Sequence, residues 1–76
     1  MSANWYAAIR KRESTEWRLL LGPYATKREA DAMHLTAVNL VEDMFPAEAL
    51  RVPIHATLKV NPEYKQPGLL SHLVAA

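Results

Sequence analysis

Gly22-Pro23-Tyr24-Ala25-Thr26-Lys27-Arg28-Glu29-Ala30 is the stretch at which a predicted strand ends and a predicted helix begins. Pro23 has no N–H for a strand ladder and Gly22 tolerates turn geometry, so both favour the end of the preceding apolar run. Thr26 stands where a helix N-cap is expected, and Glu29 follows three residues later, which is the pattern of a capping box. The stretch therefore predicts a junction from strand to helix at Thr26.

Two apolar runs before this junction alternate with the period of a half-buried strand. The two rows are Trp5, Ala7 and Ile9, and Trp17, Leu19 and Leu21. Pairing Ile9 with Trp17 places both rows on one face of a hairpin and sets Arg10 opposite Glu16 on the other. No Asn-Gly or Asp-Gly turn is present, so we expect a connection of about three to five residues around residues 12–15.

After the junction the apolar residues recur with the period of a helix from Thr26 to about Met44. The predicted core-facing stripe is Ala30, Met33, Ala37, Leu40, Val41 and Met44. Leu35 is the one large apolar residue on the opposite side of this helix. Pro46 is expected to end it, because proline disfavours helical geometry in the preceding residue.

Alternation returns in residues 51–60, which predicts a third strand. Pro53 lacks a ladder donor, so the first part of this strand is expected at a sheet edge or outside the sheet. A right-handed crossover through the helix leaves the first strand between the other two. We therefore predict an α+β fold, ββαβ, with a three-stranded antiparallel sheet in the order 2-1-3 and one helix on one face. Residues 1–60 form this domain, and residues 61–76 form a loop and a docking tail, in which residues 69–76 become a short helix only if they pack on something.

Size and composition narrow the class of protein. The 76 residues suffice for one domain, and the absence of cysteine leaves neither a disulfide framework nor a thiolate metal site. A core this small favours a homodimer. The apolar runs are far shorter than the roughly 20 residues of a membrane span. The first five residues do not resemble a secretory signal, so we expect a cytoplasmic protein.

Candidate catalytic and metal-binding residues form no recognisable motif. The histidines are His34, His55 and His72, and we expect three unrelated surface or boundary residues. With Gly22 and Gly68 as the only glycines, a phosphate-cradling loop is excluded. We expect no enzyme, no cofactor and no metal site.

The sheet face away from the helix is the predicted binding surface. Its expected members are Tyr6, Ala8, Arg10, Arg12, Arg18, Leu20, His55, Thr57 and Lys59. An apolar centre at Tyr6 and Leu20, rimmed by Arg10, Arg18 and Lys59, favours a protein interface, with Leu35 as a separate helix-face candidate. The same face is also consistent with a stacking platform for single-stranded nucleic acid, although the net charge of +1 is small for such a binder, or with a plain solvated surface.

Two resemblances accompany these observations. Residues 21–32 resemble the G-P-[FY]-x-[ST]-x-x-E-A junction of SPOR domains, which implies peptidoglycan binding, but the chain is shorter than the usual duplicated unit of that family. In size, composition and layout the chain also resembles the small orphan proteins of actinobacterial phages, which implies a non-catalytic protein that binds a host protein.

Overall fold

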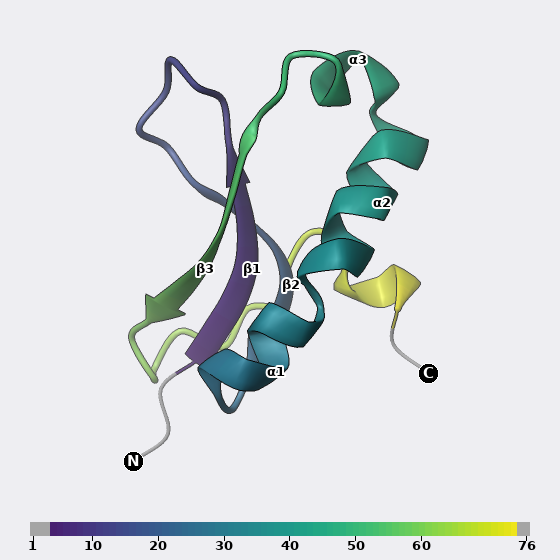
Figure 1. Cartoon of the computed structure of the whole chain (residues 1–76). Coiled ribbons are helices and arrows are strands. Elements are labelled where there is room, and N and C mark those ends of the chain that lie inside the picture. The colour runs from purple at the N-terminus through teal and green to yellow at the C-terminus, as the bar shows by residue number, and fades with distance from the viewer. Residues whose placement is uncertain (1–3, 75–76) are drawn as a thin grey trace.

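The computed structural model describes residues 4–74, which form a sheet layer and a helical layer (Figure 1). The strands are β1 (Asn4–Arg10), β2 (Arg18–Tyr24) and β3 (Ile54–Val60), and the helices are α1 (Lys27–Ala32), α2 (His34–Met44), α3 (Pro46–Ala49) and the 3-10 helix η1 (Ser71–Leu73). The sheet is antiparallel in the order β2-β1-β3, with the α helices on one face. The predicted α+β fold is therefore confirmed, and Pro53 lies just outside β3 as expected.

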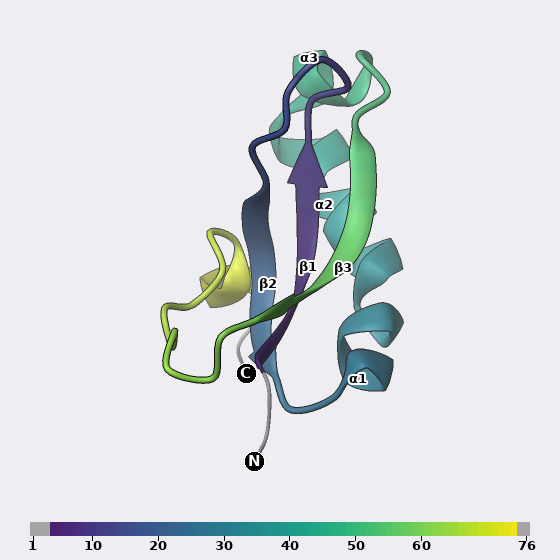
Figure 2. The same cartoon turned by 90° about the vertical axis from the view of Figure 1, so that its left-hand side faces the viewer.

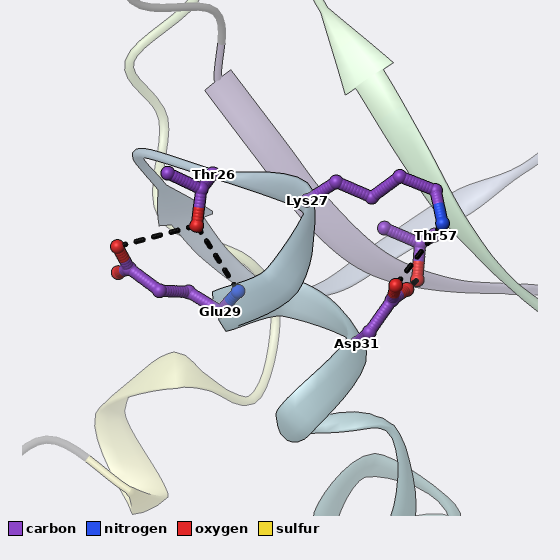
Figure 3. A network of polar contacts seen from close by, with 5 residues as sticks. All are labelled: Thr26, Lys27, Glu29, Asp31 and Thr57. Atoms are coloured by element: carbon purple, nitrogen blue, oxygen red, sulfur yellow. Dashed lines mark hydrogen bonds and ion pairs between the residues drawn. The ribbon is translucent and has the colours of Figure 1, made fainter.

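The strand-to-helix junction is built from the residues that predicted it (Figure 3). The Thr26 hydroxyl accepts a hydrogen bond from the Glu29 backbone N–H at 3.2 Å and donates to the Glu29 carboxylate at 3.4 Å. Gly22 has a φ of +137°, and a Cβ there would stand 2.8 Å from the Trp5 carbonyl oxygen and 2.7 Å from the Tyr6 ring. A glycine is therefore required where β2 passes the central strand.

The prediction of a single long helix is wrong. The chain leaves helical geometry at Met33 (φ −91°, ψ 0°), which divides the helix into α1 and α2. On one side of this break, Asp31 of α1 accepts a hydrogen bond from Thr57 of β3 at 2.5 Å. On the other side, Ala37 and Val41 of α2 are buried in the core. The break allows both segments to reach the sheet.

The helix ends before Pro46 as expected, but Pro46 also begins a further helix that was not predicted. The preceding helix ends at Met44, and Pro46 begins α3 in its first turn. Proline is well placed there, because a first-turn residue has no intrahelical partner for its N–H. Residues 46–49, between the end of the predicted helix and the predicted third strand, are thus helical.

The predicted hairpin register is also wrong. Ile9 pairs with Arg18 rather than Trp17, and Ala8 pairs with Leu19, with register irregularities between Trp5 and Ala7 and between Ala7 and Ala8. A bulge lets two consecutive residues oppose one. Leu19 consequently shares the face of Ala8, away from the helices.

Arg10 organises the hairpin loop, which runs from residue 11 to residue 17 and is longer than predicted. Its guanidinium donates to the backbone carbonyls of Lys11 and Arg12 at 3.3 Å each, and of Ser14 at 2.7 Å. Arg10 and Glu16, which the predicted register placed opposite each other, form no ion pair, since Lys27–Asp31 is the only ion pair within residues 4–74. A cation that satisfies several carbonyls stabilises this longer loop.

The C-terminal segment, residues 61–74, docks on the same chain along the outer edge of β2. Backbone N–H groups of Gly68 and Leu70 donate to the carbonyls of Gly22 and Leu20 at 3.1 and 2.8 Å. The Ser71 hydroxyl donates to the Gly22 carbonyl at 2.9 Å. Leu70 completes a buried core that also contains Ala7, Leu20, Leu21, Ala37 and Val41. The predicted short helix is reduced to η1, and the expectation for residues 75–76 lies outside the described residues.

Candidate functional site

The sheet face away from the helices is apolar, and its composition differs from our prediction. Tyr6 pairs with Leu58 and Ala8 pairs with Ala56 in a β1–β3 ladder without irregularity. Directly paired residues share a face. The apolar row of β3 therefore lies with Tyr6 and Ala8, and we define the apolar sheet face as Tyr6, Ala8, Trp17, Leu19, Ile54, Ala56, Leu58 and Val60.

Figure 2 shows this face toward the viewer, with the α helices behind the sheet. The C-terminal segment crosses only the lower end of the face before it reaches the outer side of β2. Most of the side chains on the face are half-buried by their neighbours in the sheet, while Ala8 is 1% exposed. Within residues 4–74 no further layer covers the upper part of this face, which is therefore an apolar surface.

Tyr6 is not the exposed aromatic platform that we predicted. Its side chain is fully buried, and its hydroxyl donates to the Gln66 carbonyl at 2.6 Å. The Tyr64 ring packs against it edge-to-face, with the centroids 6.0 Å apart. Burial, together with the nearby Tyr64, raises the pKa of the Tyr6 hydroxyl. The C-terminal segment thus uses Tyr6 as an anchor.

A hollow of about 470 Å³ lies beside this anchor on the same side of the sheet. Trp17 and Leu19 line it from the β2 side, and Tyr64 and Pro67 line it from the C-terminal segment. Two aromatic side chains therefore border the apolar sheet face where it meets the C-terminal segment. Neither Trp17 nor Tyr64 was among the predicted site residues.

Most of the cations expected on this face lie elsewhere. Lys59 pairs with Trp5 on the helix side, and its Nζ lies 6.0 Å from the centre of the Trp5 ring. Arg18 pairs with Ile9, which packs against the core beneath the helices. Arg10 remains, with its guanidinium carbon 5.2 Å from the centre of the Trp17 ring. The face consequently has far less positive charge than the sequence suggested.

A polar network joins α1 to the helix side of β3 (Figure 3). The Asp31 carboxylate accepts from the Thr57 hydroxyl at 2.5 Å and pairs with Lys27 at 3.0 Å. The hydrogen bond from Thr57, followed by the one from Lys27, lowers the pKa of Asp31. Thr57 therefore supports the fold and does not belong to the open face.

Two of the three histidines meet on the helix side, so our expectation of unrelated residues is wrong for this pair. The rings of His34 and His55 pack edge-to-face with centroids 5.5 Å apart. The His55 Nδ1 atom is buried without a hydrogen-bond partner. Burial and the neighbouring His34 lower the pKa of His55, while Glu42 opposes the shift. Within residues 4–74, no three His, Cys, Asp or Glu side chains are placed to hold a metal ion.

The remaining candidates separate into core and surface. Leu20 is 4% exposed and belongs to the core, because the bulge turns it inward. Leu35 is 68% exposed on α2, as predicted. The face residues that the sequence analysis missed include Leu19, Ala56 and Leu58. Leu19 was missed because the β1–β2 register differs from the predicted one. Ala56 and Leu58 were missed because β3 turns its apolar row away from the helices. The alternating apolar residues of β3 were the sequence signal that could have identified this row as part of the face.

Comparisons with protein-family models, with curated proteins and with solved structures found no match to this chain. The helices within residues 4–74 are all too short or too polar to cross a membrane.

Proposed function

We propose that this chain is a small non-enzymatic protein-binding module and that the apolar sheet face is its binding surface. The observation that supports the proposal is the row Ile54, Ala56 and Leu58 beside Ala8, on a face that the helices leave open. Contiguous apolar patches on soluble proteins commonly mark interaction sites, and buried interface centres are depleted of charge. Arg10 lies at the rim of this surface, where its guanidinium is held in place by hydrogen bonds to the Lys11 and Ser14 carbonyls of the hairpin loop.

We further propose that the first occupant of this face is a second copy of the chain. Two apolar sheet faces can pack as a sandwich with a spacing of about 10 Å, and interfaces between identical subunits are the more apolar class. A standard interface buries roughly 800 Å² per partner, and most side chains of the apolar sheet face are already half-buried within the monomer, which limits the area that a partner can cover. We therefore expect a reversible dimer that grows with concentration. The exposed Leu35 is then left for another protein, such as a host protein in a phage-type setting.

Light scattering over a range of concentrations tests this assignment with two matched lysine substitutions. Ala56→Lys places a charge on the apolar sheet face, and Leu35→Lys places the same charge on the exposed side of α2. We expect the parent and Leu35→Lys to dimerise and Ala56→Lys to remain monomeric. Circular dichroism must show that both variants are folded. A parent that stays monomeric, or an Ala56→Lys variant that dimerises normally, would contradict the proposal.

Single-stranded nucleic acid is the second candidate for the same face, because Trp17 and Tyr64 border the hollow and Arg10 lies over Trp17. Salt separates the two functions. Binding that neutralises several phosphates weakens steeply as salt rises, whereas an apolar protein interface responds little. Titration of a fluorescent oligonucleotide at several salt concentrations, beside the light-scattering series, decides between them.

A further inference from the structure

A second cavity lies on the opposite side of the sheet, beneath the helices. It has a volume of about 350 Å³ and opens between the hairpin loop, the α2–α3 junction and the C-terminal segment. Its apolar wall is formed by Ile9, Leu20, Val41, Phe45 and Leu70, which come from five separate elements or segments. Small-molecule sites are typically concave, largely apolar and about 300–1,000 Å³ in volume. The cavity is at the small end of this range.

Charged side chains also line this cavity. The cations are Arg10, Lys11 and Arg18, and the carboxylates are Glu16 and Glu48. None of these five groups belongs to an ion pair within residues 4–74. The Arg10 guanidinium is engaged by the loop carbonyls, whereas Lys11 and Arg18 are exposed. The lining therefore combines an apolar wall with a small excess of positive charge.

We propose that this cavity binds a small amphipathic anion with one apolar chain or ring system of roughly ten carbon atoms and a single carboxylate. The apolar part displaces water from the wall around Leu20 and Val41. The carboxylate lies at the charged end, where Arg18 and Lys11, whose side chains form no ion pair or hydrogen bond with residues 4–74, can donate charge-assisted hydrogen bonds. The apolar wall of this site lies on the helix side of the sheet, away from Ala56 and Leu58, although Arg18 and Leu69 line both this cavity and the hollow beside Trp17.

Nuclear magnetic resonance titration of the full chain tests the proposal with three probes below their self-association limits. Decanoate carries both features, 1-decanol keeps the chain without the charge, and acetate keeps the charge without the chain. We expect decanoate to shift the methyl signals of Leu20, Val41 and Leu70, and to bind about fivefold tighter than 1-decanol. Acetate should produce no saturable shift. Equal binding of decanoate and decanol, or shifts confined to Ala56 and Leu58, would overturn the proposal.

Two glutamine substitutions test the charged end without changing the core. Arg18→Gln should weaken decanoate binding about two- to fivefold and leave 1-decanol binding unchanged. Arg28→Gln is the matched control, because Arg28 is an exposed arginine on α1 and does not line the cavity. If Arg18→Gln and Arg28→Gln bind decanoate equally, the assignment of the carboxylate position is wrong. Loss of dimerisation in Ala56→Lys should leave decanoate binding unaffected, so the two proposals can fail separately.

Discussion

Leu70→Ala measures how firmly the C-terminal segment is docked. Leu70 is 4% exposed and belongs to the core cluster around Leu21. Replacing a buried leucine with alanine costs about 2–5 kcal/mol. Leu70 also borders the cavity of about 350 Å³, so water can enter the space that the substitution leaves. We therefore expect a loss in the lower part of the range, about 2–3 kcal/mol.

Such a loss is a large part of the total for a chain of 76 residues, whose free energy of unfolding should be about 4–11 kcal/mol. The thermal midpoint should fall by roughly 10–20 °C. Urea unfolding followed by circular dichroism measures the change, and an unchanged slope shows that the same surface is exposed.

Leu69→Ala is the matched control, because the adjacent Leu69 side chain is 60% exposed while its backbone N–H bonds to the Leu19 carbonyl at 2.9 Å. This variant should change stability by no more than about 0.5 kcal/mol. If Leu70→Ala and Leu69→Ala unfold at the same urea concentration, the C-terminal segment does not complete the core.

Three further predictions follow from individual contacts. Gly68→Ala should loosen the C-terminal segment, because its Cβ would stand 2.4 Å from the Leu20 backbone, and hydrogen exchange at the β2 edge should accelerate. Tyr6→Phe should lose about 1 kcal/mol in urea unfolding because the Gln66 carbonyl loses its donor; a variant as stable as the parent would show that this hydrogen bond contributes nothing. His55, with a lowered pKa, stays neutral in the folded chain while the unfolded chain takes up a proton below about pH 6.5, so stability should fall between pH 7 and pH 5.5. His55→Gln should flatten this pH dependence, and an unchanged slope would assign it to another group.

The order of the elements could be predicted because each depends on local chemistry. Thr26 and Glu29 mark the helix start by their spacing, and the period-2 runs identify three strands. The antiparallel order follows from connection handedness once the elements are known. These features require no knowledge of distant contacts.

The residues on each sheet face could not be predicted, because a period of two defines two rows without showing which row meets the helices. In β2 the run Leu19, Leu20 and Leu21 is apolar at every position, so it accommodates a bulge without a sequence signal. In β3 the polar row faces the helices, where Thr57 donates a hydrogen bond to Asp31 and the His55 ring packs against the His34 ring. The bulge in β2 and the orientation of β3 both depend on tertiary contacts, which the local sequence does not show.

The central claim is that two copies of the chain pack together through the apolar sheet face. It is tested most directly by measuring the solvent exposure of this face at low and high protein concentration. A soluble paramagnetic chelate broadens the methyl signals of side chains that solvent reaches. If two copies pack through this face, the signals of Ala56, Leu58 and Leu19 should be broadened in the dilute protein and protected in the concentrated one. Leu35 should be broadened equally in both. Equal broadening of Ala56 and Leu58 at all concentrations, or protection of Leu35 instead, would contradict the account.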